Sequence, residues 1–220
     1  PALKLGVLLL ALSCIIIALV NPKMGTKMET VKRQGIDIVF AVDISKSMLA
    51  EDVAPNRLEK TKQIVSQIIN QLGNDRVGIV GYAGSAYPVL PMTTDYSIAK
   101  MYLQSMNTNM VSSQGTAFND AIQLAVDFFD VKDTSKLIIL ISDGEDHGEG
   151  AEDAIEMAKE KGVRILTIGV GTEKGGPIPL RDDKGTIASY KKDSEGQTVT
   201  TKLYPEVLKN IADKTKSKYI

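Results

Sequence analysis

Cysteine, histidine and tryptophan are almost absent from this chain. Its 220 residues include one cysteine, Cys14, one histidine, His147, and no tryptophan. A single cysteine excludes an internal disulfide, and a structural zinc site would lack the thiolate and imidazole ligands that it needs. Catalysis by a Cys-His pair or a Ser-His-Asp triad is not expected unless another chain supplies residues.

An excess of either charge is also missing. The 26 basic and 27 acidic side chains are scattered along the sequence and give a formal net charge of -1. Such a chain has no basic surface for a phosphate backbone, so nucleic acid is not expected as a partner. The length, with 43% hydrophobic residues, allows one sizeable α/β domain and a short appendage.

The appendage is the uncharged run LGVLLLALSCIIIALV at residues 5–20. At about 1.5 Å per residue it covers roughly 24 Å, and the flanking residues extend it toward the thickness of a hydrocarbon core. We predict a transmembrane helix over residues 1–22 and a linker over 23–34. The sequence Asn21-Pro22-Lys23 is not a small-x-small cleavage site, which favours an anchor over a signal peptide or a buried core helix.

From Gly35 onward, short β-branched runs alternate with amphipathic helical patterns. This order predicts one α/β domain over 35–220 with a doubly wound, mostly parallel sheet flanked by helices. Strands are expected at 36–43, 76–82, 136–142 and 163–170, with an edge strand at 86–90. Helices are expected after Asn56, from 118, from 154 and from 205, and a hairpin excursion at 175–201.

Polar side chains follow the first predicted strand at every second position. Asp43, Ser45 and Ser47 form this pattern, and Asp143 follows the strand that ends at Ser142. If the strand order is 3-2-1-4-5, these two strands are neighbours, and ligands of such sheets bind beyond their carboxyl ends. Carboxylate and hydroxyl oxygens without imidazole or thiolate suit a hard cation such as Mg²⁺, Mn²⁺ or Ca²⁺.

These motifs, with Gly115-Thr116 before a central helix and Ser142-Asp143-Gly144 after a strand, resemble the von Willebrand factor A family. The resemblance implies a metal-ion-dependent adhesion site. In it, hydroxyls bind the cation directly, carboxylates act largely through water, and an acidic side chain of a protein partner completes the coordination. The implied residues are Asp43, Ser45, Ser47, Thr116 and Asp143.

Within that family, GIDIVFAVDISKSMLAEDVAPNRLEKTK at residues 35–62 and PIPLRDDKG at 177–185 resemble the Bat aerotolerance proteins of bacteria, most closely the BatB branch. The resemblance implies a bacterial cytoplasmic membrane protein with an extracytoplasmic, periplasmic domain. It also implies other Bat proteins and a MoxR-type AAA+ ATPase as partners. The basic residues Lys23, Lys27, Lys32 and Arg33 favour the opposite orientation by the positive-inside rule.

The alternative is a metal-dependent phosphatase-like hydrolase of the haloacid dehalogenase type. That family needs a second aspartate where this chain has Ser45, and no phosphate-binding loop or nucleophile elbow is found. We therefore do not expect an enzyme. The acidic residues after Asp143, namely Glu145, Asp146, Glu149 and Asp153, are interpreted as a solvated loop and helix start rather than as extra ligands. Asp52 is interpreted as a residue that shapes the turn into the first helix, with a role at the site rim as the alternative.

Overall fold

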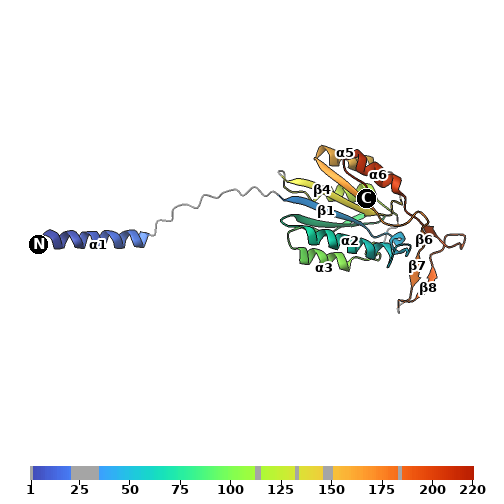
Figure 1. Ribbon diagram of the computed structural model, residues 1–220, viewed down its shortest axis with the longest axis horizontal. Helices are drawn as coiled ribbons and strands as arrows, with labels where there is room; N and C mark the ends of the chain where they lie inside the picture. Colours follow the sequence, from blue (N-terminus) through green and yellow to red (C-terminus); the bar gives the residue numbers. More distant parts are fainter. Residues whose placement is uncertain (1, 21–34, 112–114, 132–133, 146–150, 183–184) are drawn as a thin grey trace. The chain divides into compact units, whose positions relative to one another are not determined.

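The computed structural model describes residues 2–20, 35–111, 115–131, 134–145, 151–182 and 185–220 (Figure 1). It divides the chain into two units, Pro1–Arg33 and Gln34–Ile220. The predicted bounds of helix, linker and domain, 1–22, 23–34 and 35–220, stay predictions. The predicted linker, and the basic residues within it, lie outside the described residues.

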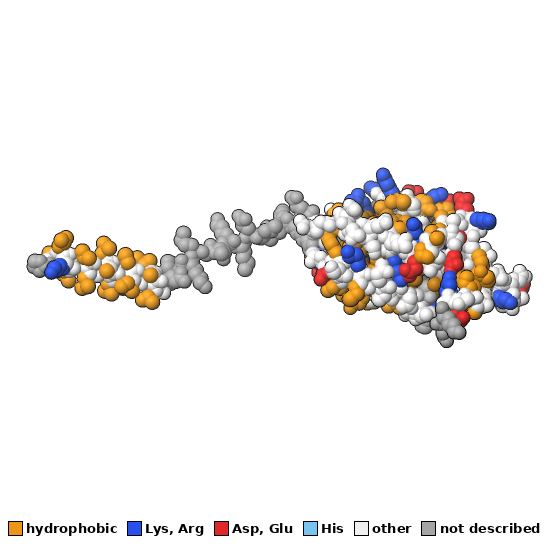
Figure 2. All heavy atoms as spheres, turned by 60° about the horizontal axis from the view of Figure 1, so that its bottom comes forward, with side chains coloured by type: hydrophobic (Ala, Val, Ile, Leu, Met, Phe, Trp, Pro, Cys, Tyr) orange, Lys and Arg blue, Asp and Glu red, His pale blue; other side chains and the backbone are white. Residues whose placement is uncertain are grey.

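The first unit consists of helix α1 (Ala2–Val20). Its stretch Ala2–Leu19 has a mean hydropathy of 2.6. Figure 2 shows apolar side chains along the whole length of this helix. By length and composition, α1 is suited to cross a membrane, as predicted from the sequence.

The second unit is built on a five-stranded sheet with the order β3-β2-β1-β4-β5. The central strand β1 (Ile36–Asp43) pairs in parallel with β2 (Arg76–Tyr82) and with β4 (Ser135–Ser142), which pairs in parallel with β5 (Val163–Gly169). The edge strand β3 (Ala86–Thr93) is antiparallel and longer than predicted. The predicted fold class and strand order are confirmed.

Helices cover both faces of this sheet (Figure 1). One face packs against α4 (Phe118–Asp127), α5 (Glu152–Glu160) and α6 (Pro205–Lys214), and the other against α2 (Arg57–Gln71) and α3 (Tyr96–Ser105). Alternate side chains of β1 enter the two cores, with Val39 in the first and Phe40 in the second. Because β1 is buried on both faces, its sequence is apolar almost throughout.

The starts of α2 and α3 are both fixed by a side chain that caps the helix. Asn56 caps α2 by accepting a hydrogen bond from the backbone N–H of Glu59 at 2.8 Å, as the sequence predicts. Helix α3 was not predicted. It begins where the Asp95 side chain accepts hydrogen bonds from the N–H groups of Ser97 and Ile98.

Residues 175–201, which we call the arm, leave the domain at one end of the sheet (Figure 1). Strands β6 (Gly176–Pro177) and β9 (Thr200–Thr201) pair at its base, and β7 (Pro179–Arg181) and β8 (Ile187–Tyr190) pair farther out. An ion pair between Arg181 and Glu51 connects the arm to the loop between β1 and α2, which we call the first loop. The predicted hairpin excursion is confirmed.

Candidate functional site

The candidate site lies at the carboxyl ends of β1 and β4, where the chain crosses to opposite sides of the sheet. Asp43 is the last residue of β1, and Asp143 directly follows β4. Ser45 and Ser47 lie at the start of the short 3-10 helix η1 (Lys46–Leu49). Thr116 precedes α4. The fold therefore brings three separate loops to the switch point at which ligands of such sheets bind.

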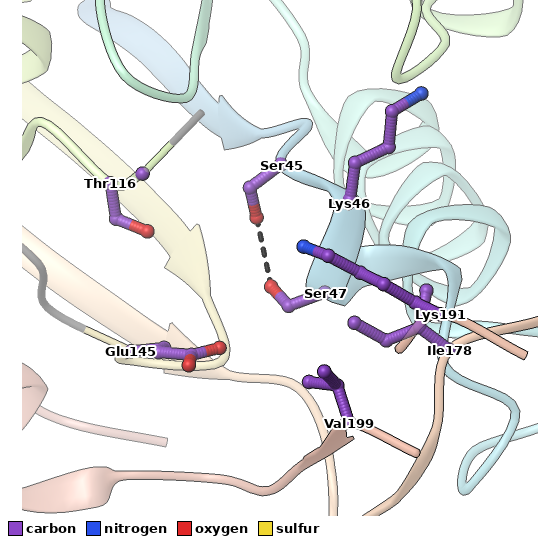
Figure 3. A pocket seen from close by; sticks show the side chains of 9 residues that line it. Ser45, Lys46, Ser47, Thr116, Glu145, Ile178, Lys191 and Val199 are labelled. Carbon is purple, nitrogen blue, oxygen red and sulfur yellow. Dashed lines mark hydrogen bonds between the residues drawn. The ribbon is translucent and has the colours of Figure 1, made fainter. Parts of the chain in front are cut away.

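Three hydroxyl groups line a cavity of about 360 Å³ at this place. The Oγ atoms of Ser45 and Ser47 lie 2.8 Å apart. Figure 3 shows the Thr116 hydroxyl facing these serines from the other side of the cavity. It makes no hydrogen bond with a described residue, so its oxygen is available to a ligand.

Asp43 lies at the base of the site and is completely buried. One carboxylate oxygen accepts a hydrogen bond from the N–H of Ser45 at 2.8 Å, and the other accepts one from Ser142 Oγ at 2.7 Å. Burial, followed by the negative charge of Asp143, raises the pKa of Asp43 to about 7. A positive charge close to Asp43 would lower the cost of burying its ionised carboxylate, because buried carboxylates are stable only when their charge is compensated.

Asp143 is also completely buried, and it is paired with Arg57. Its Oδ2 accepts a hydrogen bond from Arg57 Nη1 at 2.7 Å, and its Oδ1 accepts one from the N–H of Glu145 at 3.1 Å. The pairing differs from that of Asp43, which has no basic partner among the described residues. Of the two carboxylates at the site, only that of Asp143 is therefore compensated by a guanidinium group.

Arg57 uses all five of its N–H donors. Two bind Asp52 at 2.8 and 2.9 Å, one binds Asp143, and two bind the hydroxyl and the carbonyl of Thr201 at 3.2 and 3.1 Å. Burial opposes the charge of Arg57, but Asp52 and Asp143 outweigh it and raise the pKa of Arg57 above its ordinary value. Arg57 therefore connects three parts of the chain: the first loop through Asp52, the loop after β4 (the third loop) through Asp143, and the base of the arm through Thr201.

The interpretation of Asp52 as a residue that only shapes a turn is wrong. Besides Arg57, Asp52 accepts hydrogen bonds from the N–H and the hydroxyl of Thr172 at 2.8 and 2.9 Å. The pKa of Asp52 is lowered, because these contacts with Arg57 and Thr172 outweigh its burial. Asp52 is thus a structural partner of Arg57 behind the site.

Gly144 sets the course of the loop that carries Asp143. Its φ is +76°, a conformation that side chains disfavour, and a Cβ there would lie 2.1 Å from the carbonyl oxygen of Tyr204. The N–H of Tyr204 in turn donates to the carbonyl of Asp143 at 2.8 Å. Only glycine allows this close approach, which explains the Asp143-Gly144 pair in the sequence.

Charged side chains form the rim of the cavity. Lys46, Glu145 and Lys191 line it together with the hydroxyls. Burial, and then the positive charge of Lys191, lower the pKa of Lys46. Glu145 accepts a hydrogen bond from Thr201 Oγ1 at 3.0 Å, so its interpretation as part of a solvated loop is wrong.

The other acidic residues after Asp143 have different outcomes. Asp153 is exposed in the first turn of α5, as expected for a solvated helix start. Asp146, His147 and Glu149 lie outside the described residues.

The residues at the site fit a hard divalent cation. Hydroxyl oxygens line the cavity, the loops that line it also carry two buried carboxylates, and one of these carboxylates lacks a basic partner among the described residues. No three His, Cys, Asp or Glu side chains gather to hold a metal anywhere in the described part of the chain. A site of the zinc type is thus not seen there, while the hydroxyl and carboxylate oxygens are of the kind that suits Mg²⁺, Mn²⁺ or Ca²⁺.

The family model of the von Willebrand factor type A domain matches residues 37–213. The chain belongs to this family. A crystal structure described as conserved hypothetical protein BatB from Bacteroides thetaiotaomicron is 42% identical, with a TM-score of 0.80 over 84% of this chain and 89% of that one. An aerotolerance-related membrane protein from Bacteroides fragilis, crystallised with multiple mutations to serines, is 38% identical, with a TM-score of 0.79 over 84% and 90%.

Longer relatives also match this von Willebrand factor A chain. A protein of Mycolicibacterium paratuberculosis, described as a UPF0353 protein, is 32% identical in an alignment of 197 residues that covers 84% of this chain and 58% of the relative. The chain thus spans a little more than half the length of the curated relatives that it matches. The resemblance to the von Willebrand factor A family and its Bat members is confirmed.

Sequence reasoning missed Arg57 and the charged rim residues Lys46, Glu145 and Lys191 as parts of the site. Arg57 carries a usable signal, because a basic residue at the first position of a helix opposes the helix dipole and so indicates a carboxylate partner. Glu145 and Lys191 carry no such signal. Their place at the rim depends on how the loop after β4 and the arm come together at the end of the sheet.

Proposed function

We propose that this chain is a membrane-anchored module for cation-dependent protein-protein interaction. Ser45, Ser47 and Thr116 bind the cation through their hydroxyl oxygens, and Asp43 and Asp143 act largely through water. Mg²⁺ or Mn²⁺ is the expected cation, with Ca²⁺ as the third candidate. When bound, the cation supplies a positive centre that accepts an acidic side chain of the partner.

One observation carries this proposal: hydroxyls from two loops face one cavity, and the loops that line it also carry two buried carboxylates, of which only one has a basic partner among the described residues. Each protein group has a separate part in the arrangement. Asp43 orients the first loop by accepting the N–H of Ser45, and Arg57 holds Asp143 in place. The family membership supports the same conclusion, since the ligand positions match its adhesion motif.

A partner carboxylate would be the central contact of such an interface. A charge-assisted contact in a desolvated place is strong and selective in geometry, so one acidic residue can anchor a modest interface. Other Bat proteins and a MoxR-type AAA+ ATPase are the first partners to test, on the strength of the family likeness.

We expect the immobilised chain to capture a partner from detergent-solubilised bacterial membranes in Mg²⁺, and to release it in EDTA. Restoring Mg²⁺ should restore capture, because the protein donors remain folded without the cation. In the identified partner, changing the essential acidic residue to its amide should cost several kcal/mol, about as much as breaking a buried charged pair. Capture that is equal in EDTA and Mg²⁺ would contradict the proposal.

The phosphatase-like alternative has no supporting observation. A nucleophilic aspartate must reach its substrate, whereas Asp43 is completely buried and both of its oxygens accept hydrogen bonds. Ser45 stands at the position where that family needs its second carboxylate, and its hydroxyl contacts Ser47. The arrangement supports binding rather than hydrolysis.

We further propose that α1 anchors the protein in the bacterial cytoplasmic membrane, with residues 35–220 on the periplasmic side after the linker at 23–34. The apolar helix supports the anchor, as does the likeness to an aerotolerance-related membrane protein. The orientation is what the resemblance to Bat proteins implies. Protease added to intact spheroplasts should therefore digest the domain. A chain without residues 1–20 serves as the control for the anchor. Because it lacks α1, it should no longer be found in the membrane fraction. A domain that is protected in intact spheroplasts would show the opposite orientation.

A further inference from the structure

Lys191 is the basic residue that the arm places at the cation site. It follows β8 and is held on the arm by the hydrogen bond from its N–H to the carbonyl of Ile178 at 2.9 Å. Figure 3 shows its side chain extending across the cavity, with the ammonium group toward Ser45 and Ser47. Its side chain makes no hydrogen bond or ion pair with a described residue.

A lysine at this place is unfavourable for binding a cation. Like charges repel, and Lys46 on the same rim already adds a positive charge close to that of Lys191. The ammonium group of Lys46 is occupied, because it donates to Thr108 Oγ1 at 3.0 Å and to Asn109 Oδ1 at 2.6 Å. Lys191 has no such contacts with the described residues, and its charge is free to meet a ligand.

The neighbouring cavity does not offer a basic side chain as free as that of Lys191. It measures about 410 Å³, shares Lys46 with the first cavity, and is also lined by Lys62 and Arg181. Those two are already neutralised, Lys62 by Glu59 and Arg181 by Glu51. An incoming carboxylate would therefore meet at Lys191, beside the hydroxyl groups, a positive charge whose hydrogen-bond donors are not already used by described residues.

From this placement we infer that Lys191 is a second contact for the partner's carboxylate, and that it makes cation binding and acid binding depend on each other. The inference rests on the proposed function. Lys191 repels a cation that binds alone, whereas a carboxylate between the two positive charges attracts both. Each ligand then binds more tightly in the presence of the other, and the coupling is reciprocal.

The test is whether replacing Lys191 raises the affinity for a cation and lowers the affinity for an acidic peptide. Both affinities are measured on the full chain in non-ionic detergent. Lys191→Met should bind Mn²⁺ about fivefold more tightly than the unchanged chain at low salt, because one positive charge near the site is gone. The same variant should bind a synthetic Gly-Ser peptide with one glutamate about fivefold more weakly. Calorimetry gives the first affinity, and surface plasmon resonance with the immobilised chain in saturating Mn²⁺ gives the second.

Two variants control for charge and for shape. Lys192→Met makes the same change at the adjacent exposed residue, which does not line the cavity, and should alter neither affinity. Lys191→Arg keeps the charge and should restore both. Lys46 is a poorer choice, because it stands between Ser45 and Ser47 and its replacement could move them.

The outcomes separate the inference from the proposed function. If the unchanged chain binds the glutamate peptide no better than its glutamine counterpart, or binds no Mn²⁺, the proposed function fails and the inference with it. If the unchanged chain prefers glutamate and Lys191→Met shifts the two affinities in the same direction or not at all, the inference alone is overturned. Opposite shifts that Lys192→Met does not reproduce support it.

Discussion

Replacing Arg57 by methionine should lower the free energy of unfolding by about 3–5 kcal/mol, the usual result of breaking a buried ion pair by removing one partner. Arg57 is completely buried and gives its five N–H groups to Asp52, Asp143 and Thr201. Methionine fills much of the volume but leaves two carboxylates without their counter-charge. Urea titrations of the full chain in detergent, followed by circular dichroism in EDTA, measure the loss.

Arg181→Met is the matched control for this prediction. Arg181 forms an ion pair as well, with Glu51, but both side chains are partly exposed. This pair should therefore contribute at most about 1 kcal/mol to the free energy of unfolding. If the two variants lose the same small amount, the Arg57 network is not the connection between site and arm that its contacts indicate. Addition of Mg²⁺ should return part of the stability to Arg57→Met, since the cation replaces some of the missing charge.

The fold could be read from the sequence because its signals are local and periodic. The buried strands β1, β2, β4 and β5 are apolar runs, and the Asn56 cap and the helical spacing mark where α2 begins. Helix α3 escaped prediction because only Ala99 and Leu103 are buried along it, too few to produce a clear stripe. Its capping residue, Asp95, was the remaining signal.

The site was predictable only as far as its motifs extend. Asp43, Ser45 and Ser47 form one short motif, and strand order brings Asp143 beside it. The contacts of Arg57 with Thr201, and the approach of Lys191 from the arm, join residues more than 140 positions apart. No local pattern encodes such contacts, because they depend on how the arm packs against the loops.

The substitution Asp43→Asn should abolish cation binding while it raises the stability of the cation-free chain. Asparagine has the shape of aspartate and can still accept the N–H of Ser45, whereas alanine would leave the buried donors of Ser45 and Ser142 unpaired. Its lack of charge should weaken Mg²⁺ or Mn²⁺ binding by about 100-fold or more, as expected for a group in or next to the metal's coordination shell.

The gain in stability follows from the pKa of Asp43. This pKa is about 7 in the folded chain, well above its ordinary value, so the folded chain favours the protonated carboxyl group. Stability is therefore lost as the pH rises and both states ionise, and at about pH 8 the full cost is present. The amide of Asp43→Asn cannot ionise, so urea titrations in EDTA should show a gain of about 1–3 kcal/mol. Asp120→Asn, the same change at an exposed residue of α4, should show neither effect.

Thr116→Ala separates a cation site that serves a partner from one that serves only the fold. The Thr116 hydroxyl faces the cavity and has no described hydrogen-bond partner, so its removal should hardly change stability. If Thr116 binds the cation in the arrangement that accepts a carboxylate, its loss should weaken partner capture much more than cation affinity. Equal losses in calorimetry and in capture would instead indicate a structural cation. Capture that survives EDTA, Asp43→Asn and Thr116→Ala alike would rule out a cation-dependent interface, because the two variants and the chelator act on the same centre through different atoms.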